Sequence, residues 1–433
     1  MRVRAAGTPL VGLAAAALAL AACDPERPPR IGAVVLQEAW CSRPGLPSPL
    51  RQTVVVIDDR AVRRVENPSE FRTANADLFR LVSSLGGVSD AVRGGLLAPR
   101  ERVSVLLAPV DGAAPRLLFS GCAPALSAAE FEAARAQRGG VGNFGDDMTG
   151  GGIASDLSTA QEQFDNSLVG TVARLGGGAP PAAITEPLAG SSLVRSLKST
   201  GRLVDPAHGL SRIFVVARRA LFAAAGDGVA ARREGFAAGR AAGLNLGQAE
   251  VHVIGERSGN GDAARETAHA FLLVSGASLG SWGGDFNGLP GAPARVETFN
   301  GHIAYPPSRV PMSIRLAADA QGRLVNSWLA LSEGPDRLDV ATPITGRMTC
   351  AGSDRCTVTS DAGGLAQAWS SDPDAEAEWS PDLPLGGLRS LEATLTGPRL
   401  EGRVFDPGVG QIGEAPGTTF LPFSLTRTSG GPQ

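Results

Sequence analysis

Two patterns of hydrophobic and polar positions divide the chain. Up to about residue 281, runs of β-branched residues alternate with segments of helical spacing. Gln52–Asp59 (QTVVVIDD) is a continuous apolar run, which is typical of a strand buried on both faces. Pro68–Leu85 carries its apolar residues at the spacing of one helix face, and Asn67 precedes it as an N-cap. This alternation predicts a doubly wound, mainly parallel α/β sheet with helices on both faces.

The same reasoning predicts the other elements of the first half. The further strands are Arg102–Ala108, Arg116–Ser120, Arg212–Ala217 and Ala249–Gly255. The further helices are a short one capped by Ser127, then Asp156–Leu175, Ile184–Ser199, Val229–Ala242 and Asp262–Ser275. Gly139–Gly152 is rich in glycine and is interpreted as a surface loop, because it lacks the lysine of a phosphate-binding loop.

After about Ser281 the helical period gives way to alternation of polar and apolar residues. Gly, Pro, Asp and Ser separate the alternating segments at short intervals, which predicts an antiparallel barrel or sandwich. The predicted strands are Thr298–Tyr305, Met312–Ala318, Leu324–Leu331, Arg347–Cys350, Leu391–Thr396, Arg399–Phe405 and Thr418–Leu425. The predicted organisation is therefore a leader at 1–22, a tether and extended lead-in at 23–50, an α/β domain at 51–281, a linker at 282–293 and a β domain at 294–433.

The amino-terminal end predicts export and a lipid anchor. Arg2 and Arg4 are followed by the apolar run Leu10–Ala22, which is too short to span a bilayer as a mature helix. The run closes on Leu20-Ala21-Ala22-Cys23, which resembles the lipobox of bacterial lipoproteins. That resemblance implies acylation of Cys23, cleavage before it, and a place in the bacterial cell envelope facing the periplasm or the exterior. Asp24 resembles an inner-membrane sorting signal, but the choice of membrane stays open.

Charge and composition restrict the partners further. The formal net charge is −3 and becomes more negative once Arg2 and Arg4 leave with the leader. A mildly acidic chain without a long basic run disfavours nucleic acid. No later stretch reaches 18 apolar residues, so Cys23 is the one membrane attachment that the sequence predicts.

Four cysteines remain after Cys23, and an even number in an exported chain indicates disulfides. Cys350 and Cys356 flank Ala-Gly-Ser-Asp-Arg, which suits a bridge across the end of a hairpin. Cys41 and Cys122 would then pair over a long loop. A metal site is the alternative, and the absence of nearby histidines at ligand spacing disfavours it.

The order of elements over roughly residues 50–280 resembles a von Willebrand factor type A domain. In that family a metal-ion-dependent adhesion site lies at the carboxyl ends of the strands, built from Asp-x-Ser-x-Ser, a threonine and a later aspartate. Asp58 matches the first aspartate, and Thr185 (with Thr149 as a rival) matches the threonine. Oxygen ligands of this kind suit Mg²⁺.

This chain departs from the family pattern at the other positions. Arg60 and Val62 stand where the serines should be, and the strand at Ile213–Ala217 runs into Arg218 rather than an aspartate. We therefore expect a degenerate, metal-free site in which the guanidinium of Arg60 or Arg218 neutralises Asp58. The alternative is that Asp58 and Asp59 end the strand in a solvated turn. No other cofactor is expected.

Other candidate chemistry is sparse. Gly276-Ala277-Ser278-Leu279-Gly280 fits the Gly-x-Ser-x-Gly pattern, but it follows a helix rather than a strand, so we interpret it as a helix-ending turn. Asp146 and Asp147 lie in the glycine-rich loop. The histidines, His208, His252, His269 and His302, show no zinc-site spacing. Trp282 and Phe286 are expected to pack the two domains together, and Trp328 to lie in the β core.

The sequence thus favours a membrane-anchored, non-catalytic module that binds or assembles envelope proteins. One alternative is an envelope hydrolase acting on glycan or ester with Asp146, Asp147 or Ser278. Another is carriage of a small ligand inside the β domain. A pocket with two carboxylates, or a serine and a histidine, within hydrogen-bond reach would favour the enzyme, and an apolar cavity would favour the carrier.

Overall fold

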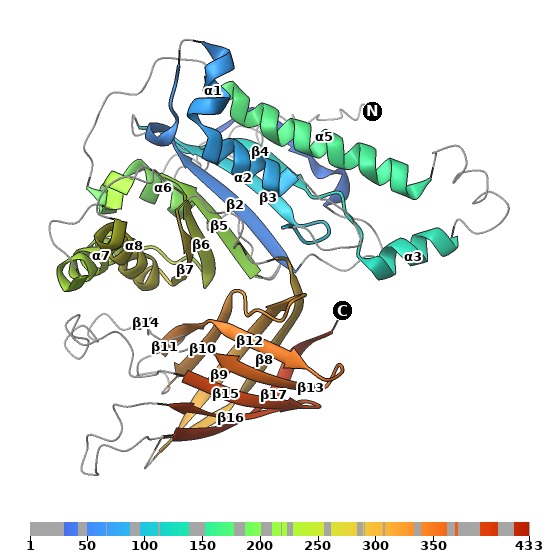
Figure 1. The fold of residues 1–433 in the computed structure, drawn as a ribbon. Helices are drawn as coiled ribbons and strands as arrows, with labels where there is room; N and C mark the ends of the chain where they lie inside the picture. Colours follow the sequence, from blue (N-terminus) through green and yellow to red (C-terminus); the bar gives the residue numbers. More distant parts are fainter. Residues whose placement is uncertain are drawn as a thin grey trace, which may run out of the picture.

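A computed structural model of the protein shows two β-sheets, each with its own hydrophobic core (Figure 1). It describes residues 30–41, 50–65, 67–86, 96–110, 113–137, 152–176, 187–200, 210–217, 219–222, 228–254, 261–283, 289, 291–305, 308–332, 339–361, 369–370, 390–405 and 420–432. The predicted leader, Cys23 and Asp24 lie outside these residues.

The first sheet has seven strands in the order β1-β4-β3-β2-β5-β6-β7. They are β1 (Arg30–Gln37), β2 (Arg51–Asp58), β3 (Arg102–Ala108), β4 (Arg116–Cys122), β5 (Leu210–Val216), β6 (Ala249–Ile254) and β7 (Ala277–Trp282). Strands β3, β2, β5, β6 and β7 are parallel, while β4 runs antiparallel to β3 and parallel to β1. The predicted mainly parallel α/β sheet is confirmed.

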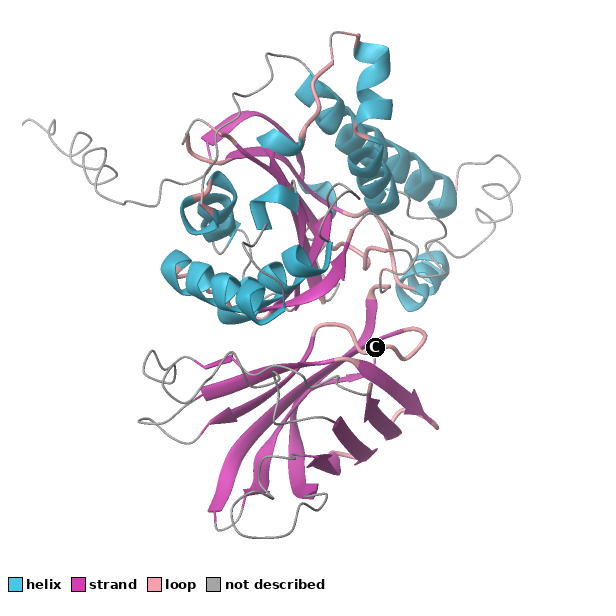
Figure 2. Cartoon of the chain, turned by 60° about the vertical axis from the view of Figure 1, so that its left-hand side comes forward, coloured by secondary structure: helices cyan, strands magenta, loops and turns pink. Residues whose placement is uncertain are grey.

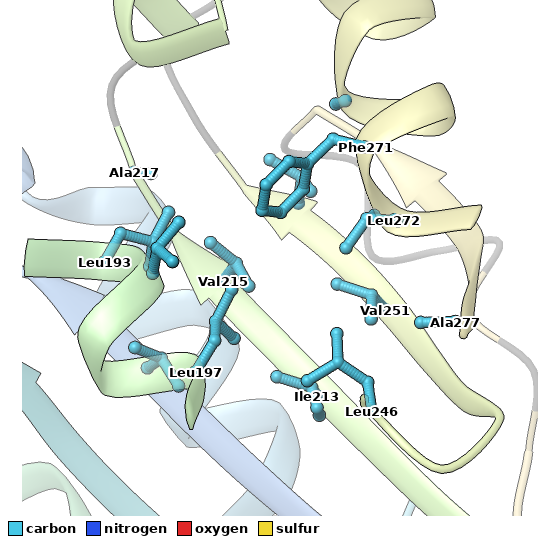
Figure 3. Close-up of a cluster of buried hydrophobic side chains, with 14 of the residues drawn as sticks. Leu193, Leu197, Ile213, Val215, Ala217, Leu246, Val251, Phe271, Leu272 and Ala277 are labelled. Atoms are coloured by element: carbon cyan, nitrogen blue, oxygen red, sulfur yellow. The ribbon is translucent and has the colours of Figure 1, made fainter. Parts of the chain in front are cut away.

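Helices cover both faces of this sheet (Figure 1). The helices are α1 (Pro68–Ala74), α2 (Ala76–Gly86), α3 (Ala128–Gln137), α5 (Ile153–Ala173), α6 (Ser192–Thr200), α7 (Gly228–Ala242) and α8 (Gly261–Val274). Side chains of α1, α2 and α5 pack on one face, and those of α6 and α8 on the other. Figure 3 shows the cluster on the α6 and α8 face, which includes Leu193 of α6, Phe271 of α8, Val215 of β5 and Val251 of β6.

Four local features differ from the sequence-based expectations. Residues 30–37 form β1, so the α/β sheet begins inside the expected lead-in. The helix expected at 68–85 is two helices, because Asn75 ends α1 and its side chain donates to the carbonyl oxygens of Arg63 and Phe71. The helix expected at 184–199 begins only at Ser192. Ser278 lies in strand β7, and the helix-ending residue is Gly276, with φ +68°.

The second sheet has ten antiparallel strands in the order β12-β13-β15-β16-β17-β8-β9-β10-β11-β14. They are β8 (Pro293–Tyr305), β9 (Ser308–Asp319), β10 (Ser327–Ser332), β11 (Asp339–Ile344), β12 (Gly346–Cys350), β13 (Arg355–Ser360), β14 (Trp369–Ser370), β15 (Ser390–Thr396), β16 (Arg399–Phe405) and β17 (Phe420–Pro432). Edge strand β12 bonds back to the β9–β10 turn, where Met348 N donates to Gly322 O at 2.7 Å. The sheet is therefore a nearly closed barrel, with its inward side chains packed in one apolar cluster.

The β domain docks on the amino ends of β2, β5 and β6 (Figures 1 and 2). Asn326 Nδ2 donates to Ser211 O at 3.0 Å, and Arg51 Nη1 donates to Gly291 O at 3.2 Å. The guanidinium of Arg315 reaches Gln248 O at 3.4 Å. A small apolar cluster completes the interface, consisting of Leu210, Val296, Ala317 and Val325.

Trp282, expected at the domain junction, and Trp328, expected in the β core, are both placed differently. Trp282 packs edge-on against Phe222, with ring centroids 5.7 Å apart, and so belongs to the core of the α/β domain. Trp328 is buried beside Arg315 on the side of β10 opposite the barrel interior, and its Nε1 donates to Asn326. Phe286 lies outside the described residues.

Candidate functional site

The carboxyl ends of the parallel strands lie along one side of the first sheet, which we call its carboxyl edge. At this edge the carboxylate of Asp58 is neutralised by the guanidinium of Arg60. Asp58 is the last residue of β2 and is only 1% exposed. Its Oδ1 accepts from the backbone N–H of Arg60 at 3.0 Å and from Arg60 Nε at 3.0 Å, and its Oδ2 accepts from Arg60 Nη2 at 2.9 Å. Both carboxylate oxygens are therefore bonded to one guanidinium two residues further on.

The local backbone produces this pairing. Asp58 caps the short 3₁₀ helix Asp59–Ala61, and the turn brings the Arg60 side chain back over the strand end. Asp59 in turn pairs with Arg64. A hard divalent cation would need the oxygens that the two arginines occupy, and would be repelled by the guanidinium beside Asp58.

The other residues expected at this edge, Thr149, Thr185 and Arg218, lie outside the described residues, as do Asp146 and Asp147. Within the described ranges, no group of three or more His, Cys, Asp and Glu side chains could hold a metal ion.

A buried ionic cluster lies at the other side of the sheet, at the amino ends of the strands where the β domain docks. Glu101 is 0% exposed and accepts from Arg51 Nε and Nη2, each at 3.1 Å, and from Arg212 Nη2 at 3.3 Å. It also accepts from the backbone N–H of Ala98 at 2.7 Å and from the hydroxyl of Thr53. Burial alone would raise the pKa of Glu101, but the charges of Arg51 and Arg212 lower it below its ordinary value.

A serine and a histidine meet next to this cluster. Parallel pairing of β6 with β7, shifted by an irregularity at Gly280, places Ser281 beside His252. Ser281 Oγ lies 2.9 Å from His252 Nδ1, and Glu250 Oε1 lies 3.8 Å from His252 Nε2. The imidazole is stacked on Phe214, with ring centroids 5.0 Å apart. The order of contacts is serine, histidine, glutamate.

The electrostatics of this trio follow from its burial. Burial raises the pKa of Glu250, and burial together with the charges of Arg212 and Arg51 lowers the pKa of His252 well below 6.5. The imidazole is therefore neutral at physiological pH. Three buried polar atoms here have no hydrogen-bond partner among the described residues: Arg212 Nη1, Glu250 Oε2 and His252 Nε2.

Sequence reasoning missed the ionic cluster and the Ser281–His252 pair. The one signal for the cluster was Arg212 itself, a charged residue in a mainly apolar strand. A charged residue in a strand buried on both faces needs a buried partner, but the sequence cannot say which one.

Comparison with known proteins does not assign the chain to a family. No protein-family model and no curated protein sequence matches the chain. Among solved structures, the human COPII-coat protein Sec24c is similar with 10% identity and a TM-score of 0.29, over 89% of this chain and 45% of that one. The chain therefore spans less than half the length of that protein, and a TM-score of this size does not establish a shared fold. None of the helices described here is long and apolar enough to cross a membrane.

Proposed function

We propose that the protein is a lipid-anchored envelope protein whose α/β domain is a non-catalytic, metal-independent module for binding or assembling other proteins. The observation that carries this proposal is the ion pair between Asp58 and Arg60. In open α/β sheets, ligands bind at the carboxyl ends of the strands, where the strand order reverses. Here that point lies between β2 and β5, and its carboxylate is satisfied within the chain.

The strand order supports a degenerate type A domain. With β1 set aside, the order β4-β3-β2-β5-β6-β7 corresponds to 3-2-1-4-5-6, with an antiparallel strand at one side. In the type A family the carboxyl edge binds ligand through a metal. A guanidinium in place of the metal leaves this edge able to present hydrogen-bond donors and acceptors, and removes the dependence on a cation.

The docking of the β domain supports the same use of this edge. The β domain contacts the amino ends of β2, β5 and β6, so the carboxyl edge faces away from it (Figure 1). Exposed side chains at that edge are Arg63, Asn67 and Ser69. A partner would meet these residues without displacing the β domain.

Calorimetric titration with Mg²⁺ tests the metal-free site. We expect no heat of stoichiometric binding for the wild type or for Asp58→Ala. Stoichiometric binding that Asp58→Ala abolishes would refute the proposal. Arg60→Ser supplies a matched comparison, because it removes the guanidinium while leaving Asp58 in place.

Affinity capture from solubilised envelopes tests the binding role. The intact protein is expected to retain the same partner with and without EDTA, and Arg63→Glu combined with Asn67→Arg is expected to lose it. Arg403→Glu, on the outer face of β16, is the control that retains it. Retention by the carboxyl-edge variant would assign binding elsewhere.

For the anchor, Cys23→Ser is expected to abolish incorporation of labelled palmitate and to release the protein from membranes.

A second candidate function, an ester or amide hydrolase, is favoured by one observation: Ser281 Oγ lies within hydrogen-bond reach of His252. Neutral His252 has the protonation state of a general base. Against this, the raised pKa of Glu250 makes it a weak counter-ion for an imidazolium. A fluorophosphonate probe separates the candidates: labelling that is lost in Ser281→Ala would establish the hydrolase, and absence of labelling supports the binding module.

A further inference from the structure

The disulfide between Cys350 and Cys356 has a charged environment. The two cysteines are directly opposite one another in the β12–β13 hairpin. The Nη1 of Arg295 lies 3.3 Å from Sγ of Cys356 and 3.6 Å from Sγ of Cys350. The contact between a guanidinium and a neutral disulfide stabilises the fold little, because the sulfur atoms are weak hydrogen-bond acceptors. A thiolate at the same position would give the guanidinium a charge-assisted contact.

The charges around Arg295 are unbalanced. The buried carboxylate of Glu297 pairs with Arg295 at 2.8 Å and with Arg427 at 2.8 Å. Among the described residues, the other carboxylate paired with these arginines is that of Asp354, which is exposed and lies 3.8 Å from Arg427. Two guanidiniums therefore share one buried carboxylate, and the excess positive charge lies against the sulfur atoms. A Cys356 thiolate would supply the missing negative charge.

The two sulfurs also differ in access. Cys350 is exposed at the end of β12, whereas Cys356 is only 1% exposed. A nucleophile can reach the sulfur of Cys350 and must displace that of Cys356. The group that leaves is thus the one that Arg295 stabilises, and thiol–disulfide exchange is faster when the leaving thiolate is stabilised.

We propose that Cys350–Cys356 is a redox-active disulfide that exchanges with a dithiol reductant, with Arg295 as the positioning residue that stabilises the Cys356 thiolate. A thiolate of the dithiol attacks Sγ of Cys350, and the disulfide electron pair leaves with Cys356. The second thiol of the reductant then attacks its own partner sulfur in the mixed disulfide and expels Cys350, which takes up a proton. The dithiol loses two electrons and becomes a disulfide, one proton goes to solvent, and the protein holds one thiol and one thiolate.

The hairpin keeps its shape after this reaction. Strands β12 and β13 remain joined by backbone pairing from Gly346↔Ser360 onward, and Ala351 N donates to Arg355 O at 2.8 Å beside the disulfide. Reduction therefore changes charge and sulfur chemistry locally, and the folded protein can be assayed in both states. The exchange is independent of the function proposed above.

The test uses dithiothreitol on the folded full-length protein, with timed acid quenching, alkylation and mass spectrometry of each cysteine. The disulfide Cys41–Cys122, with Cys122 buried in β4, is the internal control. We expect Cys350–Cys356 to be reduced about tenfold faster or more. Arg295→Gln should slow its reduction about tenfold, and Arg295→Lys should restore much of the rate.

Two further variants separate the charge of Arg295 from its structural role. If Arg295→Gln does not fold, Arg427→Gln carries the test, because it removes the excess charge without touching the sulfurs and should also slow reduction. Arg403→Gln, on the exposed face of β16, should reduce at the wild-type rate. Equal reduction rates for the two disulfides, or an unchanged rate in both Arg295→Gln and Arg427→Gln, would overturn the proposal.

Discussion

Replacing Glu101 with glutamine removes one charge from the buried cluster and keeps the size and shape of the side chain. Both oxygens of Glu101 accept hydrogen bonds: Oε1 from Arg51, Thr53 and Arg212, and Oε2 from Arg51 and the backbone of Ala98. Whichever way the glutamine amide turns, its NH₂ group meets a donor. The substitution therefore loses the charge and also creates a donor–donor conflict.

The magnitude follows from the burial of the partners. Arg51 and Arg212 are as buried as Glu101, so the variant leaves two guanidiniums without the buried carboxylate that bonds to both of them. Removing one partner of a buried ion pair costs about 3–5 kcal/mol. The matched control is Glu392→Gln, whose carboxylate pairs with Arg403 at 2.7 Å but is half exposed. An exposed pair of this kind contributes at most about 1 kcal/mol.

Urea unfolding with the disulfides intact, followed by circular dichroism, measures both variants. The pH dependence provides a second check. Because the folded pKa of Glu101 is lowered, its contribution is present above the unfolded value near 4.5 and is lost as the pH falls through the folded value. Glu101→Gln should therefore lose this part of the acid sensitivity. A loss of stability no larger than that of Glu392→Gln would refute the reasoning.

Four further variants test other parts of the structure. Gly280→Ala should destabilise by about 1–3 kcal/mol in thermal unfolding, because its Cβ would lie 2.7 Å from His252 Cε1; Gly170→Ala in α5, with open space around it, should stabilise by about 0.5–1 kcal/mol. Asn326→Ala removes three side-chain hydrogen bonds, of which the bond to Ser211 crosses the domain interface, and should cost about 2–3 kcal/mol and separate the calorimetric transitions of the two domains; a single unshifted transition would contradict this. Since His252 is held neutral in the fold, wild-type stability should fall as the pH drops below 6.5, by up to about 1.4 kcal/mol per pH unit, and His252→Gln should flatten this slope.

Elements with a strong local pattern could be predicted from the sequence. The β-branched run at β2 and the amphipathic helices α5, α7 and α8 carry their own periodicity, and the structure has them within a few residues of the predicted bounds. Strands β1 and β7 could not be predicted in this way. Both are edge strands that are defined by a partner far along the chain, and their own residues show no clean alternation.

The polar sites also divide into those formed by neighbouring residues and those formed by residues far apart in the sequence. The Asp58–Arg60 contact spans two residues, so the sequence could suggest it as a hypothesis. Glu101 finds its partners 50 and 111 residues away, and Ser281 reaches His252 across a shifted parallel register. Such contacts depend on which strands become neighbours, and that is a property of the sheet rather than of any local segment.

The interface between the domains explains why costly buried charges lie beneath the β domain. Its apolar part consists of Leu210, Val296, Ala317 and Val325, and an apolar contact of this size tolerates many orientations because hydrophobic burial is non-directional. The bonds from Arg51 to Gly291 and from Asn326 to Ser211 each require one register. Arg51 can point into the interface only because Glu101 offsets its desolvation. The ionic cluster thus fixes the orientation of the β domain more than it adds stability, and this orientation holds the β domain at the amino ends of the strands, away from their carboxyl ends.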